Sequence, residues 1–302
     1  FKEGANLATF HEVLSKELNV IKTLNWSLLF AIDKSLDDTE EVAQRIIENN
    51  ANCSALIFAN KAGHQNALLA GIKHSLHADV IVTMDADLQH PPSLIPSLLE
   101  KFYSGCDIVH TTRKSSEDVS LLRKTLGNLF YFIFSKLSSI DLAANSADFR
   151  LISNRVAKMV AEEFPENNIF LRGIFSWIGF KQSYVTFEAS PRMEGSTKYT
   201  FSKSLKFALN GILSFSTAPL VAAAHVGIVI ALIAIVCAMY FFIRYFYVMN
   251  LPDGWTTLIT VFLLFTGVQL IFMGIIGAYV GRIYGELKKR PRYIIEKVVE
   301  HE

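Results

Sequence analysis

The stretch Val80-Ile-Val-Thr-Met-Asp85-Ala-Asp87-Leu-Gln89-His-Pro-Pro92 begins as an apolar run and ends in two carboxylates separated by one residue. The apolar part is typical of a buried strand. Side-chain alternation weakens where a strand ends, so Asp85 and Asp87 can converge on one cation. Carboxylate oxygens are the hard ligands that suit Mg²⁺ or Mn²⁺ bridging a diphosphate. The stretch therefore predicts a strand that leads into a divalent-cation site.

Short β-rich runs alternate with longer helical runs on both sides of this stretch, up to about residue 190. The predicted strands are 26–32, 55–59, 80–84 and 107–111, and the predicted helices are 5–18, 38–49, 64–76 and 93–103. This alternation is typical of an α/β domain with a mostly parallel sheet covered by helices. Ligands collect at the carboxyl ends of such strands, so the residues just after Ile32, Met84 and Thr111 are expected to face a common crevice.

Two uncharged stretches, 219–243 and 257–281, each exceed the roughly 20 residues needed to cross about 30 Å of hydrocarbon. With 302 residues of which 51% are hydrophobic, the chain is too apolar for an ordinary soluble protein of this length. The sequence thus predicts a soluble domain over 1–200, followed over 219–302 by two transmembrane helices and a basic cytosolic tail.

The basic residues around the two stretches predict their orientation. Lys203 and Lys206 precede the first stretch, and five basic residues follow the second, at positions 282, 288, 289, 290 and 292. The loop between the stretches holds Asp253 and, after Arg244, no further basic residue. Because cytosolic loops carry the excess of Lys and Arg, a multi-pass protein of the inner membrane is expected, with its soluble domain and both termini in the cytosol.

Two further segments are candidates for contact with the membrane surface. Residues 119–140 combine clustered aromatic residues with interspersed Arg123, Lys124 and Lys136, which suits either a core helix or an interfacial helix on the lipid headgroups. The same applies to 201–218, expected as a juxtamembrane helix. The formal net charge of +1 gives no electrostatic reason to expect nucleic acid as a partner.

Four other motifs accompany the carboxylate stretch. They are Asn60-Lys-Ala-Gly63-His-Gln65, Ser146-Ala-Asp148-Phe-Arg150, Arg192-Met-Glu-Gly195-Ser-Thr-Lys198-Tyr199, and Gly277-Ala-Tyr-Val-Gly281-Arg282-Ile-Tyr with Arg290-Pro-Arg-Tyr293 beyond it. Together they resemble family 2 glycosyltransferases of the GT-A fold. Within that family the resemblance is to polyprenyl-phosphate sugar transferases, such as dolichol-phosphate mannose synthases and bactoprenol glucosyltransferases, and it covers almost the whole chain.

The resemblance implies roles for residues of this sequence. It implies a Mg²⁺ or Mn²⁺ held by Asp85, Asp87 and Gln89, and a nucleotide-sugar bound by Glu3, Asp33, Lys61, Asp85, Arg192 and Lys198. It implies a lipid phosphate met by Arg113, Arg123 and Arg150, and catalytic roles for Asp87, Asp148, Arg113 and Arg123. The residues themselves support parts of this, because a lipid phosphate and a departing diphosphate both need cationic partners. Helix capping is the alternative for Asp148, and a simple linker is the alternative for the polar loop around Gly195.

The sequence departs from the family pattern in two places. Residues 1–7 match only the end of the family's opening Pro-Val-Tyr-Asn-Glu motif, so the family's first strand is expected to be missing. The family's Asp-Asp-Gly-Ser, which contacts base and ribose, is Ile32-Asp33-Lys34-Ser35 here. One carboxylate is lost and Lys34 replaces a glycine in this loop.

The function implied is inverting transfer of a sugar from a nucleotide-sugar to a polyprenyl phosphate, with UDP-glucose and undecaprenyl phosphate as the expected substrates. Transfer of mannose or an amino sugar is an alternative, and so is a non-catalytic membrane scaffold that retains the fold. A processive polysaccharide synthase would need a Gln-x-x-Arg-Trp motif, and Trp177 lies in Phe175-Ser-Trp-Ile-Gly instead. Relatives of this type also suggest a homo-oligomer.

Overall fold

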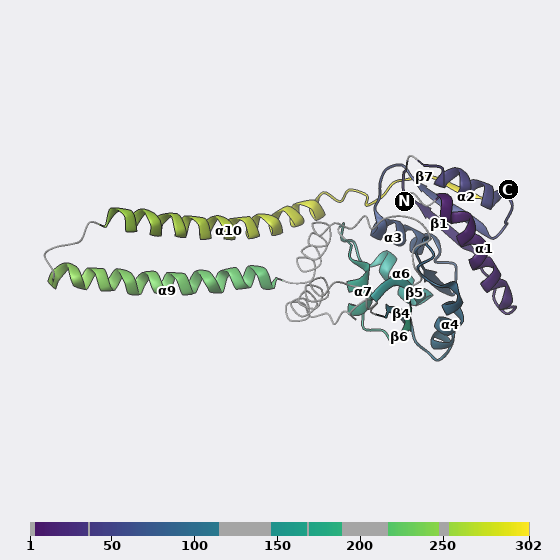
Figure 1. Cartoon of the computed structure of the whole chain (residues 1–302), viewed down its shortest axis with the longest axis horizontal. Coiled ribbons are helices and arrows are strands. Elements are labelled where there is room, and N and C mark those ends of the chain that lie inside the picture. The colour runs from purple at the N-terminus through teal and green to yellow at the C-terminus, as the bar shows by residue number, and fades with distance from the viewer. Residues whose placement is uncertain are drawn as a thin grey trace.

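The structure, a computed structural model, describes residues 4–35, 37–114, 146–167, 169–188, 217–247 and 254–301. An α/β domain carries a pair of long helices that project away from it (Figure 1). The helix expected over 119–140 lies outside the described residues, as does the juxtamembrane helix expected over 201–218 except for its last two residues.

The strands form two sheets. The first has the order β1-β2-β7 and consists of β1 (Leu28–Ile32), β2 (Cys53–Phe58) and β7 (Ile295–Glu300). The second has the order β3-β5-β4-β6 and consists of β3 (Val80–Thr83), β5 (Ser146–Ser153), β4 (Ile108–Arg113) and β6 (Gln182–Phe187). β1 is parallel to β2 and β4 is parallel to β6, whereas β5 is antiparallel to β3 and β4, and β7 is antiparallel to β2.

The α/β class followed by an apolar hairpin is confirmed, but the sheets are mixed rather than mostly parallel. The alternation pattern located β1 to β4 to within two residues or so and did not mark β5, β6 or β7. Two of these three strands enter the sheets in the opposite direction to their neighbours, which is why the expected parallel character is not met.

Helices cover both faces of the sheets. Neighbouring residues of a strand point to opposite faces. Val109 and Leu151 therefore pack with side chains of α1 (Gly4–Val20), α2 (Thr39–Glu48) and α4 (Ile95–Tyr103), which follows the short 3-10 helix η1 (Pro92–Leu94). Ile108 and Ile152 pack on the other face, with α3 (His64–His74), α6 (Asn154–Glu162) and α7 (Leu171–Trp177). With both faces covered, polar side chains gather where strands end.

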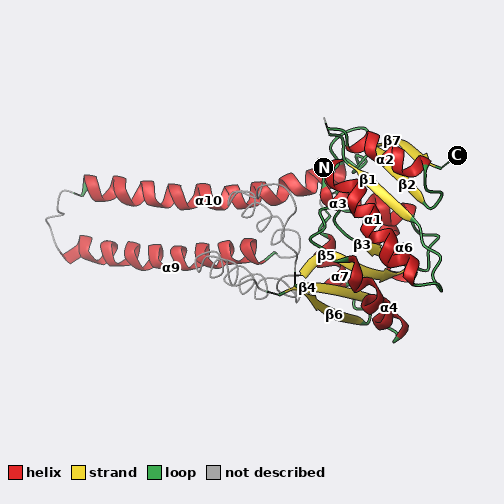
Figure 2. Cartoon of the chain, turned by 45° about the vertical axis from the view of Figure 1, so that its right-hand side comes forward, coloured by secondary structure: helices red, strands yellow, loops and turns green. Residues whose placement is uncertain are grey.

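The projecting pair consists of α9 (Ala218–Tyr247) and α10 (Trp255–Leu287), which lie side by side in both views (Figures 1 and 2). By length and composition both are apolar enough to cross a membrane, and their apolar windows, Leu220–Cys237 and Leu264–Leu287, are not buried in the protein. They contain the expected ranges 219–243 and 257–281. Helices that are apolar all round are stable where lipid covers them.

After α10 the chain returns to the α/β domain and ends in β7, which pairs with β2 (Figure 2). The sequence suggested only a basic cytosolic tail here. The pairing places Val299 opposite Ala55, and Val299 packs on the core of the first sheet. The tail is therefore a structural part of the domain, because β7 forms an antiparallel ladder with β2 that runs from Ser54 opposite Glu300 to Phe58 opposite Ile295.

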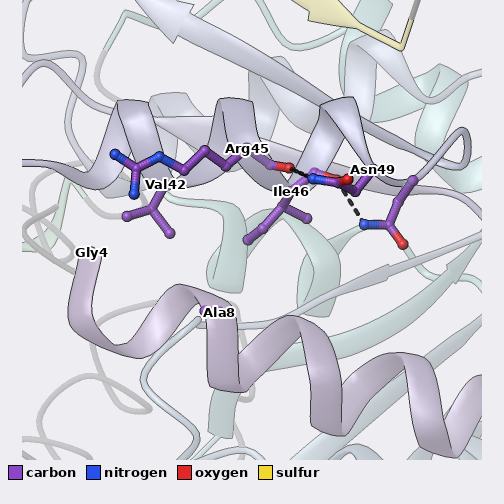
Figure 3. A pocket seen from close by; sticks show the side chains of 7 residues that line it. Gly4, Ala8, Val42, Arg45, Ile46 and Asn49 are labelled. Atoms are coloured by element: carbon purple, nitrogen blue, oxygen red, sulfur yellow. Dashed lines mark hydrogen bonds between the residues drawn. The ribbon is translucent and has the colours of Figure 1, made fainter.

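A shallow groove separates α1 from α2 (Figure 3). Ala8, Val42 and Ile46 line it, and the side-chain amides of Asn49 and Asn50 near its end donate to carbonyl oxygens of α2 itself. None of the described candidate site residues lines this groove. The described candidate site residues lie mainly elsewhere, near the ends of β3, β4 and β5.

Candidate functional site

The loop after β3 carries the two carboxylates of the metal motif. The backbone N–H of Asp85 donates to Nδ1 of His90 (3.1 Å), and the N–H of Gln89 donates to Oδ1 of Asp87 (3.1 Å). Leu88 has a φ of 59°, in the left-handed region that a leucine rarely adopts. Backbone strain of this kind concentrates at functional sites. The loop is thus held in a defined turn at the carboxyl end of β3.

The donor atoms of this loop fit a hard divalent cation. The side chain of Asp85 is 41% exposed, and Asp85 and Asp87 both carry carboxylate oxygens. Among the described residues, no group of three or more His, Cys, Asp or Glu side chains is placed to hold a metal ion, so a closed zinc-type site is not formed there. Mg²⁺ typically uses one or two carboxylates and takes its other ligands from water and substrate phosphates. Asp85 and Asp87 match that pattern.

Arg113 lies beside the same loop. It is exposed at the end of β4, and its Nη1 is 3.5 Å from Oε1 of Gln89. Gln89, expected as a third metal ligand, therefore has its side-chain oxygen directed toward a guanidinium. A cation next to two carboxylates is well placed to contact a phosphate that also binds a metal there.

Asp148, on β5, is the centre of a buried ion-pair cluster. Arg172 donates to both of its oxygens, from Nε to Oδ1 (2.8 Å) and from Nη2 to Oδ2 (2.7 Å). Arg150 donates from Nη2 to Oδ1 (3.0 Å), and Nε2 of His64 lies 2.9 Å from Oδ2. A carboxylate with this many charge-assisted hydrogen bonds is fixed in both position and orientation.

The partners of Asp148 also determine its charge. Burial would raise the pKa of this carboxyl group, but the hydrogen bonds from His64 and Arg172, and the positive charges of Arg172 and Arg150, hold the pKa well below its usual range. Asp148 is therefore ionised at neutral pH and is a poor proton acceptor. Its side chain bonds His64, Arg150 and Arg172 and lies on a strand, so it does not cap a helix, which was the alternative role.

Arg150 lies under this cluster and is only 2% exposed. Its guanidinium packs 4.8 Å from the centre of the Phe175 ring and contacts Asp148 and the Ala147 carbonyl oxygen. Burial lowers its pKa to about 10, against the opposing pull of Asp148, so it remains charged. Nη1 has no hydrogen-bond partner in the described part of the chain. Its guanidinium is buried beneath Asp148, and the expected contact of Arg150 with the acceptor stays a prediction.

His64 lies between the carboxylates of Asp85 and Asp148. It opens α3, its side chain is 49% exposed, and its Nδ1 lies 3.8 Å from Oδ1 of Asp85 while Nε2 contacts Asp148. Burial lowers the pKa of His64, but the hydrogen bond with Asp148 and the negative charge of Asp85 outweigh this and raise the pKa above its ordinary value. His90, on the other side of Asp85, is buried against the Phe149 ring, and this burial lowers its pKa.

Sequence reasoning missed His64 and Arg172 as site residues. His64 stands inside the quoted motif Asn60–Gln65, but a single histidine after a glycine gives no signal of its partners. Arg172 is 24 positions from Asp148 in the chain and no local spacing connects them. Only the packing of α7 against β5 brings the arginine onto the carboxylate.

Asp33 is bonded to the loop before α3. It follows β1, is buried, and its carboxylate accepts backbone N–H groups of Ala62 (2.6 Å) and Gly63 (3.1 Å). Gly63 has a φ of 82°, which glycine adopts without strain. Asp33 therefore holds the loop that leads into His64, and its expected contact with a nucleotide stays a prediction. Lys34, in place of the family's glycine, forms an exposed ion pair with Glu296 of β7 (2.7 Å).

The remaining expected site residues are only partly placed. Lys61 is exposed in the loop between β2 and α3. Glu3, Arg123, Arg192 and Lys198 lie outside the described residues. Their expected contacts with donor and acceptor therefore stay predictions.

Comparison with known proteins identifies the family. The family model described as Glycosyl transferase family 2 matches residues 2–160, more than half of the chain. The chain belongs to glycosyl transferase family 2. The matched range contains the carboxylate loop after β3 and Asp148 of the buried cluster, whereas Arg172 lies beyond it. The expected family is therefore confirmed.

Several relatives resemble this family 2 glycosyltransferase over almost its full length. A protein named prophage bactoprenol glucosyl transferase homolog, from Escherichia coli strain K12, is 33% identical over 298 residues, which cover 99% of this chain and 96% of that protein. The bactoprenol glucosyl transferase of Shigella phage SfII is 33% identical over 297 residues, covering 98% and 95%. An uncharacterized glycosyltransferase of Bacillus subtilis strain 168, YkcC, is 36% identical over 276 residues, covering 90% and 84%. The similarity thus includes α9 and α10.

Proposed function

We propose that this glycosyltransferase moves a sugar from a nucleotide-sugar to a polyprenyl phosphate at a membrane surface. The observation that carries the proposal is the bridge formed by His64, which brings the exposed carboxylate of Asp85 and the arginine-bound carboxylate of Asp148 into one site. Relatives named bactoprenol glucosyl transferase support a polyprenyl acceptor and glucose as the sugar. We therefore propose UDP-glucose and undecaprenyl phosphate as the substrates.

In the proposed reaction, a phosphate oxygen of the lipid attacks the anomeric carbon from the face opposite the nucleotide, and the configuration inverts. Asp85 and Asp87 would hold a Mg²⁺ or Mn²⁺ ion, which when bound stabilises the negative charge of the leaving diphosphate. The lipid phosphate is already anionic at neutral pH, so no strong general base is needed. This agrees with the low pKa of Asp148, which leaves it ionised and occupied by its cationic partners.

The cationic residues have proposed roles on both sides of the reaction. Arg113, beside Gln89, is proposed to contact phosphate next to the metal loop. Arg123 is proposed to meet the lipid phosphate, and Arg192 and Lys198 the diphosphate of the donor. Two charged substrates that must approach each other need such neutralisation. A homo-oligomer remains a proposal by resemblance.

A radiolabel assay tests the reaction. The purified full chain is incubated with undecaprenyl phosphate, Mn²⁺ and one labelled donor at a time: UDP-glucose, UDP-galactose, UDP-N-acetylglucosamine or GDP-mannose. We expect label in the lipid fraction from UDP-glucose, and its loss when EDTA removes the cation. Transfer only from another donor would correct the sugar. No transfer from any donor, together with no metal-dependent donor binding, would instead favour the non-catalytic scaffold.

The proposed use of a cytosolic nucleotide-sugar requires a defined topology, with the α/β domain and both chain ends on the cytosolic side. An Asp253→Cys variant is expected to react with a membrane-impermeant thiol reagent added to intact cells, because the base distribution places the loop between α9 and α10 outside the cytosol. A Lys289→Cys variant, in the exposed segment after α10, is the control and should react only after permeabilisation. The reverse labelling pattern would overturn this orientation.

A further inference from the structure

The last turn of α10 is bonded to a loop of the α/β domain. Both carboxylate oxygens of Glu286 accept the backbone N–H of Asn167, at 3.0 and 2.8 Å. The side-chain amide of Asn167 donates to the carbonyl oxygen of Gly285 (3.2 Å). The end of an apolar helix that is long enough to cross a membrane is thus joined directly to the loop before α7.

The contacts of Gly285 and Glu286 with Asn167 form a junction between α10 and the α/β domain. The segment that follows α10 extends this junction. Arg292 donates from Nη2 to the carbonyl oxygen of Phe164, in the same loop, and its own carbonyl oxygen accepts from the side-chain amide of Asn66 on α3 (3.4 Å). The Tyr293 ring packs edge-on against Phe58 at the end of β2. The junction therefore contacts three parts of the domain: the loop before α7, the first turn of α3 and the end of β2.

Two of these segments, the first turn of α3 and the loop before α7, contain or lead to side chains that bond Asp148. His64 lies two residues before Asn66, and Arg172 lies five residues after Asn167. The backbone N–H of Leu171 donates to Oε1 of Gln65 (3.0 Å), which ties the two segments to each other. The junction, the two segments and Asp148 form one continuous set of contacts from the end of α10 to the buried carboxylate.

We infer that Glu286 is a positioning residue for sugar transfer, acting through Asn167 and Arg172 on the site around Asp148. The inference rests on the proposed function. The acceptor is a lipid and the donor binds the α/β domain, so the geometry between the membrane helix and the domain must be kept. A displacement of about 1 Å far from the reacting atoms can cost a hundredfold in rate. An acidic side chain that accepts one N–H through both oxygens sets that geometry at the junction.

The test compares Glu286→Ala, which removes the acceptor, with Glu286→Gln, which keeps one carbonyl oxygen for the Asn167 N–H. For the alanine variant we expect kcat for lipid glycosylation to fall about tenfold while the KM for the donor stays within twofold, and amide hydrogen exchange to speed up over residues 166–172. The glutamine variant should stay within threefold of wild type. Lys288→Ala is the matched control, because its ammonium packs on Tyr284 of the same helix, and it should change neither measurement.

The outcomes separate this inference from the proposed function. Wild-type kcat in Glu286→Ala despite faster exchange over 166–172 would show that the junction only fastens the helix, and unchanged exchange would show that Glu286 does not hold the loop. Either result overturns the inference. If Glu286→Ala does not fold, Asn167→Ala, which removes only the bond to Gly285, should give a smaller change in the same direction, and no change would also overturn it. If wild type transfers no sugar at all, the proposed function fails, while the exchange comparison still tests the contact.

Discussion

Asp85→Ala and Asp87→Ala are each expected to abolish sugar transfer while leaving the protein folded in detergent. Both residues lie on a partly exposed loop after β3 and pack on little of the core. If they hold the cation that stabilises the leaving diphosphate, losing one ligand should lower turnover roughly a thousandfold, or about 4 kcal/mol of transition-state stabilisation. The measurement is lipid glycosylation at saturating Mn²⁺, alongside the thermal unfolding temperature.

The matched control for these variants is Asp79→Ala. Asp79 is exposed at the opposite end of β3, and its contact with Asn154 is through its backbone carbonyl oxygen, which the substitution keeps. We expect turnover close to wild type. Turnover within tenfold of wild type in the Asp85 or Asp87 variants would contradict the metal assignment.

Asp148→Ala is expected to destabilise the fold by about 3–5 kcal/mol, since it leaves a buried guanidinium without its counter-charge. Arg150 is 2% exposed and its only carboxylate contact among the described residues is Asp148. The double variant Asp148→Ala/Arg150→Met replaces the unpaired charge with an apolar side chain of similar length. It should recover much of the stability but not the activity, because Arg172 and His64 would still lack the carboxylate that positions them. Recovery of both would contradict the proposed role of the cluster.

The ion pairs of Asp148 also predict how the stability of the protein depends on pH. The folded pKa of Asp148 is lowered, so its stabilising contribution is present above the ordinary aspartate pKa of about 3.9 and is lost as the pH falls toward the folded pKa. The stability difference between wild type and Asp148→Ala should therefore be largest near neutral pH and shrink in acid. Unfolding followed at several pH values measures this difference, and a gap that widens in acid would contradict the lowered pKa.

The pattern of consecutive residues was sufficient to predict several elements of this protein. The apolar runs of β1 to β4 and the helices between them are visible because burial repeats every two residues or every three to four. The two long uncharged stretches needed only length and composition to predict α9 and α10. The Asp-x-Asp loop was predicted for the same reason, since both acidic residues follow directly on a buried strand.

Contacts between distant segments were beyond the reach of such patterns. The motif around Asp33 predicted a nucleotide ligand and gave no sign that two backbone N–H groups of the loop before α3 donate to its carboxylate. The motif around Arg150 predicted an acceptor ligand and gave no sign that the packing of β5 and α7 buries its side chain. The direction of a side chain depends on which elements pack around it, and this is not a property of its neighbours in sequence.

The sequence by itself determined an α/β domain of glycosyl transferase family 2, its carboxylate loop and an apolar helical pair. Only the tertiary structure decided that His64 bridges Asp85 and Asp148, that Arg172 clamps Asp148, and that the C-terminal segment returns as β7. The physical reason is the nature of the interactions. Hydrophobic periodicity can be read from consecutive residues, whereas ion pairs and backbone-to-side-chain bonds join residues as far as 262 positions apart, and only the folded chain brings those segments together.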